Sequence, residues 1–350
     1  KTGARELNYI SDVDVVYVAE AGADGDEREA LEVATRLAAA TASACSGPGT
    51  EAPLWTVDAN LRPEGRNGVM SRSLNAYREY YGRWSALWER QALLRARPCA
   101  GDRDLGRRFE ELINPLRWAQ EGLLPQDLRE IRRIKARVEA ERLPRGIDPA
   151  RHLKLGPGGL SDVEWSAQVL QLAHAGRIAG LRTTSTTGAL QAAVQAGLLS
   201  ADDGGVLVAA WILASRLRSA IVLGTGRASG PRSQVLPVQI REIRLVGRLI
   251  GLGSGKEREL EDLYRRSARH TRAVAERIVF TDGTAHGSPP SAPTPSTSTS
   301  VSQDQSAEPA PGRSTGSARN AHGQSRRGTA ASGSRSPRRA GRNRATRRRP

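Results

Sequence analysis

The sequence predicts an α+β protein in which a mixed strand and helix region precedes an all-α helical bundle and a disordered tail. The β-branched and aromatic run from Val13 to Val18 is typical of a buried strand. From Pro125 onward, apolar residues recur at spacings of three and four, as in amphipathic helices. After Thr281 the chain is rich in Ser and Pro and then in Arg, so it can bury little. The predicted regions are 1–120, 121–281 and 282–350.

The first region contains two predicted strands and two predicted helical segments. The strand at 13–18 is followed by a helix at 24–45 with an apolar side. A second strand covers 54–63 and ends at Pro63. Residues 73–97 are predicted to be helical and hold five aromatic side chains, which favours a packed hinge between two domains.

The second region reads as helical throughout. In the segment 125–144, Pro125 suits an early helical position and Pro144 stops the helix. A glycine loop then leads into a helix that begins near Leu160. The pattern predicts three further amphipathic helices, which together indicate a helical bundle: 186–199, 201–223 and 257–280.

Charge and cysteine content narrow the class of protein. The net charge of +16 is concentrated in the tail, where twelve arginines after residue 285 face only Asp304 and Glu308. These arginines have no interleaved aromatic residues for base stacking, so a dispensable extension is favoured over a nucleic-acid-binding segment. Two cysteines without metal-ligand spacing fit a reducing compartment. With no signal peptide and no run of 18 apolar residues, we expect a cytoplasmic protein without a membrane span.

The strongest motif is a Ser-Asp-x-Asp at the start of the first strand. Asp12 and Asp14 would lie on one face of that strand, with Cα atoms about 6.6 Å apart. Asp58 lies in the apolar context of the second strand. Three carboxylates on two strands could hold the two Mg²⁺ ions of phosphoryl or nucleotidyl transfer. The alternative is a solvated strand end whose carboxylates only face water.

Four residues outside this motif carry weaker signals. Arg62 is suited to bidentate contact with a phosphate, although it could be a surface arginine before a proline. Asp162 is interpreted as a complement to a helix dipole, and Glu164 as part of a capping box with Ser161. Lys154 is a rare lysine in an arginine-dominated chain, which is a mild functional signal.

The stretches "KTGARELNYISDVDV" and "VDANLRPEGRNG" resemble the signature of the glutamine synthetase adenylyltransferase/adenylyl-removing enzyme family. In that family a Gly-Lys-x-Gly-x-x-Glu-Leu loop leads into Ser-Asp-x-Asp, and a later Asp-x-x-Leu-Arg-Pro completes the site. Further stretches resemble the family in the same order: "WERQALLRARPCAGD", "KLGPGGLSDVEWSAQVLQLAHA" and "LRTTSTTGAL". The resemblance covers roughly residues 1–280 and implies a DNA polymerase β-like nucleotidyltransferase domain followed by a helical domain.

The resemblance also implies roles and partners. Asp12, Asp14 and Asp58 match the metal-binding and catalytic carboxylates, with Mg²⁺ as cofactor. A second group of residues would bind the nucleotide: Lys1, Gly3, Ser11 and Arg62. Asp58 could help to deprotonate an attacking tyrosine hydroxyl. The implied partners are glutamine synthetase as protein substrate, ATP or phosphate, and a PII-type signal protein.

The direction of the reaction stays open at this point. We expect transfer of AMP from ATP to a tyrosine of glutamine synthetase, with phosphorolytic removal of AMP as the alternative. The N-terminal motifs resemble the removing half of the family's enzymes, whereas later stretches resemble the transferring half. A chimera formed by in-frame deletion, a non-catalytic remnant and a nucleic-acid-binding protein remain further alternatives. The chain opens on Lys1 within a motif, so we expect a fragment that lacks the first strand of its nucleotidyltransferase domain.

Overall fold

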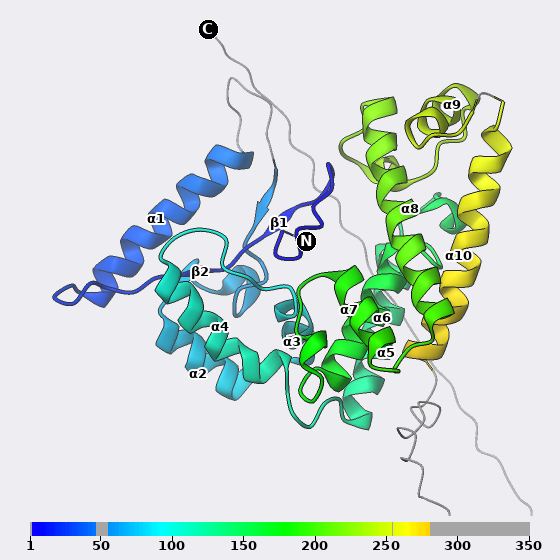
Figure 1. Ribbon diagram of the computed structural model, residues 1–350. Helices are drawn as coiled ribbons and strands as arrows, with labels where there is room; N and C mark the ends of the chain where they lie inside the picture. Colours follow the sequence, from blue (N-terminus) through cyan, green and yellow to red (C-terminus); the bar gives the residue numbers. More distant parts are fainter. Residues whose placement is uncertain (1, 47–54, 254, 281–350) are drawn as a thin grey trace, which may run out of the picture. The chain divides into compact units, whose positions relative to one another are not determined.

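The computed structural model (Figure 1) describes residues 2–46, 55–253 and 255–280, which belong to one compact unit. This part of the chain is mostly helical and carries four short parallel strands, so an α+β fold is confirmed at that level. Lys1 and the predicted tail at 282–350 lie outside the described residues. The predicted domain boundary near residue 120 stays a prediction.

The strands are shorter than the sequence predicts, and they form two separate pairs. β1 (Val13–Asp14) lies parallel to β3 (Val57–Asp58), and β2 (Tyr17–Val18) lies parallel to β4 (Ser71–Arg72). The prediction of one continuous strand at 13–18 and of a second at 54–63 was therefore wrong in extent. After Asp58 the chain turns, so the first segment loses β3 as a partner and pairs with β4 two residues later.

Three of the four helices of the first region pack around an aromatic cluster beside β2, and the first helix contacts β3 and β4. Tyr77 and Tyr81 are buried there, and the Tyr77 hydroxyl donates to the carbonyl of Tyr17 on β2. The predicted helical segment at 73–97 is broken into two helices at Ser85 and Ala86, and a further helix follows that the sequence pattern did not predict. The four helices are α1 (Glu27–Ser46), α2 (Leu74–Trp84), α3 (Leu87–Leu93) and α4 (Arg103–Arg117).

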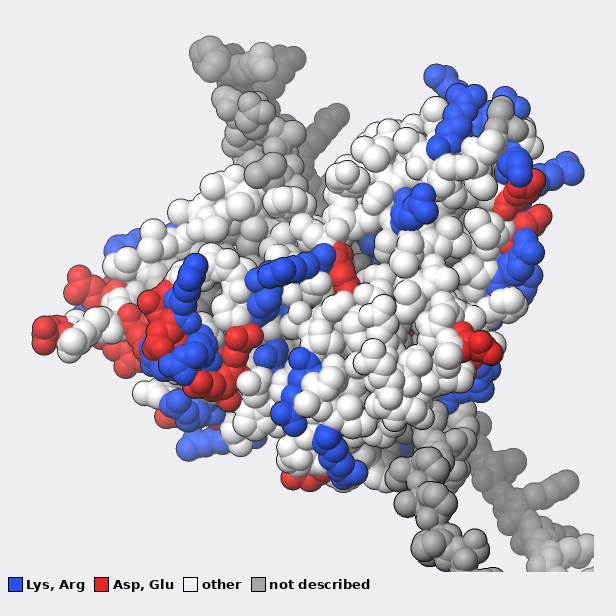
Figure 2. Space-filling view, in the orientation of Figure 1, with Lys and Arg blue, Asp and Glu red and all other residues white. Residues whose placement is uncertain are grey.

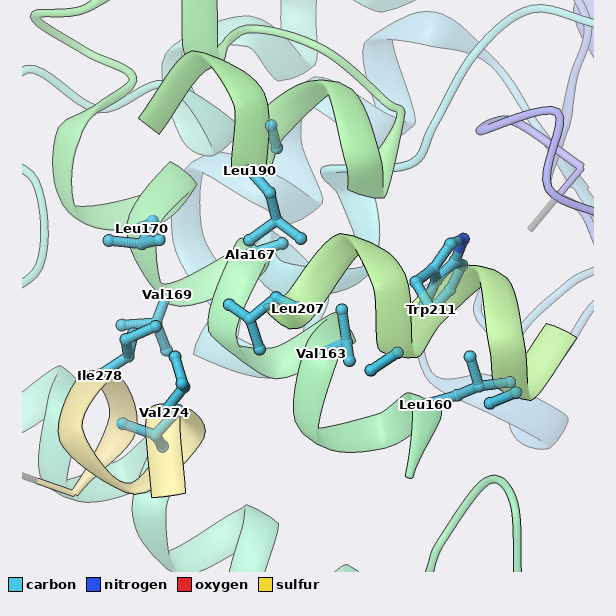
Figure 3. Packing of buried hydrophobic residues seen from close by; sticks show 14 of the residues in the cluster. Leu160, Val163, Ala167, Val169, Leu170, Leu190, Leu207, Trp211, Val274 and Ile278 are labelled. Carbon is cyan, nitrogen blue, oxygen red and sulfur yellow. The ribbon is translucent and has the colours of Figure 1, made fainter. Parts of the chain in front are cut away.

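The remaining helices share a larger hydrophobic core. Figure 3 shows Val163 and Ala167 of α6 near Leu207 and Trp211 of α8, with Leu190 of α7 close by. The helices predicted in this region are present, and α9 is an addition. They are α5 (Pro125–Arg142), α6 (Leu160–His174), α7 (Thr186–Gln195), α8 (Ala201–Thr225), α9 (Ile240–Leu249) and α10 (Glu257–Val279). Short 3₁₀ turns lie at Gly65–Asn67, Pro149–Arg151, Ala179–Leu181 and Pro231–Gln234.

Helix α8 is the one described helix that is long and apolar enough to cross a membrane by length and composition. Leu207, Leu217 and Ile221 of this helix are fully buried in the core. The core helix of a soluble protein meets the same criterion, so the apolar composition of α8 is accounted for by packing within the fold.

A buried ion network fixes the start of α6 against α5 and α10. The Lys135 ammonium lies 2.5 Å from the Asp162 carboxylate and 2.6 Å from Glu139, and both Lys135 and Asp162 are buried. Asp162 also accepts the N–H of Gly158 at 2.7 Å, and Arg272 lies 3.4 Å away. Each buried charge is paired and hydrogen-bonded. Removing either partner would leave the other charge buried and unpaired, which is strongly destabilising.

The same network corrects two interpretations of the sequence. Asp162 is a buried ion-pair partner and does more than complement a helix dipole. The capping box expected from Ser161 and Glu164 is absent, because α6 begins two residues earlier than Ser161 at the N-cap would require: its first residue is Leu160, and the N-cap is Gly159, which forms no side-chain cap. Glu164 instead lies 3.8 Å from the guanidinium of Arg95.

We expect Asp162→Ala to lower the free energy of unfolding by about 3–5 kcal/mol, because it leaves a buried lysine without its main counter-charge. Urea unfolding measures this value. Asp262→Ala, which removes an exposed carboxylate from α10, is the matched control and should change stability little. Equal destabilisation by the two variants would contradict a structural role for the ion network.

Candidate active site

The parallel pairing of β1 with β3 brings two of the three predicted carboxylates together. Asp14 is the direct register partner of Asp58, so the two side chains extend from neighbouring strands toward the same face. Asp12 precedes Asp14 by two residues and is exposed just before β1 begins. The pair Asp14 and Asp58 is therefore the centre of the candidate site.

The electrostatic environment of Asp14 is that of a crowded carboxylate. Burial of the group by surrounding protein atoms raises its pKa, although part of the side chain remains open to solvent. The negative charges of Asp58 and Asp12 raise this pKa further, whereas the positive charge of Lys154 lowers it. Like charges held this close favour a cation or a proton between them.

A magnesium ion fits the pair better than it fits a three-carboxylate site. Within the described residues, no group of three or more His, Cys, Asp or Glu side chains converges closely enough to hold a metal. Mg²⁺, however, is commonly held by one or two carboxylates and completes its shell with water and substrate phosphates. One oxygen of Asp58 accepts the N–H of Asn60 at 2.7 Å, which fixes the orientation of that carboxylate. The three-ligand arrangement stays a prediction.

Arg62 points into the loop that follows Asp58. Its guanidinium donates to the carbonyls of Ala59 at 2.9 Å, Gly68 at 2.9 Å and Arg66 at 3.3 Å, and the side chain is buried. These bonds hold the loop in a compact turn directly after β3. In this structure Arg62 therefore organises the loop directly after Asp58.

Gly3 and Ser11 lie at the two ends of the loop that leads into β1. A Cβ atom on Gly3 would lie 1.8 Å from the carbonyl oxygen of Arg95, so only glycine fits there without a backbone shift. The Gly3 carbonyl accepts hydrogen bonds from Arg97 and Thr184. The hydroxyl of buried Ser11 accepts the N–H of Asn8 at 3.2 Å. Both residues thus fix the loop, and a role in phosphate binding stays a prediction.

Glu6, in the same loop, makes contacts that the sequence interpretation did not predict. Its carboxylate accepts the N–H and the hydroxyl of Thr186, each at 2.7 Å, at the first turn of α7. It also accepts from Ser185 at 3.2 Å and from Arg95 at 3.2 Å. A carboxylate at a helix N-terminus is favoured by the helix dipole. The motifs "GARELN" and "TTSTTG" contact each other here. This contact could not be predicted from the sequence, because the two motifs lie far apart in the chain.

A cavity of about 330 Å³ opens beside Asp14. Val16, Val18 and Phe109 contribute apolar lining, and Arg97 and Gln168 contribute polar groups. A small cavity of this size with mixed lining suits a drug-sized ligand such as a nucleoside.

Surface charge does not single out this region on the face drawn in Figure 2. Acidic and basic side chains are intermixed over α1, α2 and α4, while basic side chains gather over α9. The negative charge of the candidate site therefore comes from its own few carboxylates and not from a larger charged surface.

Two family models and several curated proteins are similar in sequence to this chain. The family model of glutamate-ammonia ligase adenylyltransferase matches residues 1–112, and that of GlnD PII-uridylyltransferase matches residues 131–279. The chain is 50% identical over 278 residues to the bifunctional glutamine synthetase adenylyltransferase/adenylyl-removing enzyme of Streptomyces coelicolor. It is 44% identical over 278 residues to the protein of the same description from Mycobacterium avium. These matches confirm the resemblance drawn from the motifs.

The matched region covers 79% of this chain and 27% of each relative. The chain thus spans about a quarter of the length of the curated relatives it matches. Both strand carboxylate motifs fall within the adenylyltransferase match, and the buried ion network of Lys135 and Asp162 falls within the second match.

We expect Asp14→Asn to raise the melting temperature of the metal-free protein at pH 7. The pKa of Asp14 is raised in the folded state, so its ionised form costs stability: the cost is full above the folded pKa, shrinks as pH falls from there toward the ordinary pKa of 3.8, and is absent below 3.8. Added Mg²⁺ should stabilise the unchanged chain more than the variant, because only the unchanged chain holds the full carboxylate pair. Thermal unfolding with and without Mg²⁺ measures both effects.

Asp24→Asn removes an exposed carboxylate outside the site and is the control for this experiment. It should keep the full Mg²⁺ effect. Equal Mg²⁺ stabilisation of the Asp14 and Asp24 variants would contradict metal binding at the strand pair.

We expect Glu6→Gln to loosen the loop from Gly3 to Ser11. The variant replaces a charged acceptor of several hydrogen bonds, each worth about 1.5–3 kcal/mol, by a neutral one. Amide hydrogen exchange in this loop should accelerate by about tenfold or more. Glu79→Gln, at an exposed position on α2, is the control. Unchanged exchange in the loop would show that Glu6 does not hold it.

Proposed function

We propose that this chain, a segment related to the bifunctional glutamine synthetase adenylyltransferase/adenylyl-removing enzymes, is a Mg²⁺-dependent nucleotidyltransferase that transfers AMP from ATP to a tyrosine of glutamine synthetase. The observation that carries the proposal is the register of β1 and β3, which sets Asp14 beside Asp58. Both residues lie in the part of the chain that matches the adenylyltransferase family model. The regulated process would be nitrogen assimilation.

The two strand carboxylates have distinct roles in this proposal. Asp14 and Asp58 would hold Mg²⁺, and Asp12, two residues before Asp14, would be the third carboxylate of the site. The bound metal supplies charge stabilisation for the phosphoryl oxygens. Asp58, fixed by its bond to the Asn60 N–H, also accepts the proton of the attacking tyrosine hydroxyl. The exposed position of Asp12 and Asp14 leaves room for a protein substrate to approach.

The nucleotide would bind across the carboxylates and the neighbouring cavity. We place the adenosine in the cavity beside Asp14, because the apolar lining of this cavity suits a nucleoside base. Gly3 and Ser11 shape the loop at the edge of the site, and the loop amides are the donors proposed for the phosphates. Arg62 acts on the nucleotide through the turn that presents Asp58. Lys1 completes this set as a proposed phosphate ligand.

The proposed partners follow from the similarity of the two matched regions of the chain to known protein families. Glutamine synthetase is the protein substrate, and ATP or phosphate is the small-molecule substrate. The match of residues 131–279 to a PII-uridylyltransferase family model supports a PII-type protein as effector. We place the protein in the cytoplasm, where these partners would be found.

Phosphorolytic removal of AMP is the second candidate function. The curated relatives are described as both adenylyltransferases and adenylyl-removing enzymes, which supports removal as the second candidate. Transfer and removal share the metal-binding carboxylates and differ in the acceptor. Direct assays of both reactions therefore separate them.

We expect Asp14→Asn and Asp58→Asn each to reduce AMP transfer by about 100-fold or more, because each removes a metal-binding charge from the reacting centre. The assay uses labelled ATP, Mg²⁺ and purified unmodified glutamine synthetase. A parallel assay offers AMP-modified glutamine synthetase and phosphate. Asp24→Asn is the matched control and should keep full activity.

Transfer without removal supports the first proposal, and removal without transfer replaces it by the second. An unchanged chain that performs neither reaction under these conditions would contradict a catalytic function. Full activity of the Asp14 variant would contradict the carboxylate assignment.

A further inference from the structure

Exposed leucines lie together where the end of α8 packs on α9. Leu223 of α8 is 61% exposed, and Leu249 and Leu245 of α9 are 49% and 37% exposed. A Cβ atom on Gly224 would lie 3.4 Å from side-chain atoms of both Leu245 and Leu249. These two side chains therefore cover the turn of α8 that also carries Leu223. A contiguous apolar patch on a protein surface is typical of an interaction site.

Two exposed arginines border these leucines. Arg241 lies one helical turn before Leu245 on α9, and Arg248 lies three residues after it, so all three share one side of the helix. Among the residues that the structure describes, neither arginine forms an ion pair, whereas Arg227 pairs with Glu242 of α9 at 2.5 Å. We define the α8–α9 surface by five residues: Leu223, Arg241, Leu245, Arg248 and Leu249.

The segment that carries this surface is strongly basic. Residues 204–256 contain eight lysines and arginines and a single acidic residue, Glu242, which is already paired with Arg227. Figure 2 shows basic side chains over α9. A surface with this charge attracts acidic partners and repels basic ones. The complementary ligand is therefore acidic and has apolar side chains that can cover the leucines.

The α8–α9 surface begins one helical turn from the loop that leads to the candidate carboxylates. The side-chain amide of Asn8 donates to the Ser215 carbonyl at 3.2 Å and to the Ser219 hydroxyl at 3.0 Å. Leu223 follows Ser219 by four residues, so it lies about 6 Å further along the same face of α8. Asp12 follows Asn8 by four residues in sequence. A ligand on this surface would therefore lie beside the candidate active site.

We propose that the α8–α9 surface binds an acidic segment, with exposed apolar side chains, of the protein that receives AMP. The leucines form the apolar centre of the contact, and the arginines at its border pair with carboxylates of the segment. Binding here holds the acceptor protein next to the strand that carries Asp14. That this acceptor is glutamine synthetase rests on the proposed function, whereas the chemistry of the surface does not.

Other classes of partner fit this surface less well. An anionic membrane binds a helix whose apolar face is free, but α9 buries Val246 and packs Ile243 on the core. A nucleic acid gains nothing from exposed leucines, and the one aromatic residue of 204–256, Trp211, is buried and so is not placed to stack on bases. A second copy of the same surface would bring like charges together.

The test measures binding of unmodified glutamine synthetase to the full chain by surface plasmon resonance, with EDTA and without nucleotide. Arg241→Glu combined with Arg248→Glu should weaken binding by about tenfold or more and reduce its dependence on salt, because it reverses two charges. Leu223→Asp should also weaken binding by about tenfold or more, because it places a charge in the apolar centre of the contact. All three positions are exposed, so the melting temperature should change little.

Matched controls change exposed positions outside the surface. Arg129→Glu combined with Arg137→Glu reverses two charges on α5, and Leu37→Asp replaces a leucine of α1 that is 64% exposed. Both controls should keep the affinity of the unchanged chain. Absence of glutamine synthetase binding by the unchanged chain, or equal binding by the surface variants and the controls, would overturn the proposal.

Two parallel measurements separate the other classes of partner. They use vesicles of phosphatidylserine and phosphatidylcholine, and a single-stranded RNA oligonucleotide. The arginines after residue 285 are the same in every variant, so only differences between variants report on the α8–α9 surface. Equal vesicle and RNA binding by all variants supports a protein partner. Vesicle or RNA binding that falls in the surface variants, with glutamine synthetase binding unchanged, would overturn the proposal.

Kinetics distinguish failure of this proposal from failure of the proposed function. Asp14→Asn lies outside the α8–α9 surface, so it should bind glutamine synthetase as the unchanged chain does. In the transfer assay the surface variants should raise the KM for glutamine synthetase and leave kcat and the KM for ATP unchanged. A chain that binds through this surface but transfers no AMP would contradict the proposed function alone. Transfer with an unchanged KM in the surface variants would contradict the binding surface alone.

Discussion

The Glu6 carboxylate is the contact on which the position of the candidate catalytic strand depends. It accepts hydrogen bonds from the start of α7 and from Arg95, and these partners lie far from Glu6 in sequence. Gly3 reinforces the contact, since any side chain there would collide with the Arg95 carbonyl. β1 begins only a few residues later, so this attachment sets where Asp14 lies with respect to the helical region. The strand pair alone could not impose that position, because β1 and β3 are each two residues long.

Charge is distributed differently in the two regions that the loop connects. The strand side contributes the crowded carboxylates Asp14 and Asp58, and on the helical side Lys154 is a cation whose charge acts on Asp14. The network of Lys135 and its two carboxylates is closed and balanced, which suits a structural role. Mg²⁺ would balance the crowded strand carboxylates in the way that Lys135 balances its two carboxylates.

The sequence pattern predicted those features whose causes are local. Helix boundaries such as Pro125 follow from backbone chemistry, and the Ser-Asp-x-Asp spacing placed Asp12 and Asp14 correctly at the entry to β1. Features that depend on distant partners could not be predicted in this way. The Lys135–Asp162 pair joins residues 27 apart, and the contact of Glu164 with Arg95 replaced a capping box that satisfied every local rule. Strand length was overestimated because pairing depends on where the partner strand turns away.

The central claim is that β1 and β3 together bind one divalent cation in front of the helical region. Paramagnetic broadening by Mn²⁺, measured on the amide resonances of the full chain, tests it most directly. The account predicts that substoichiometric Mn²⁺ first broadens the amides around Val13 and Val57, followed by those of the loop near Lys154. Broadening that begins instead at the acidic surface residues of α1 or α4, with the amides of β1 and β3 unaffected, would contradict it.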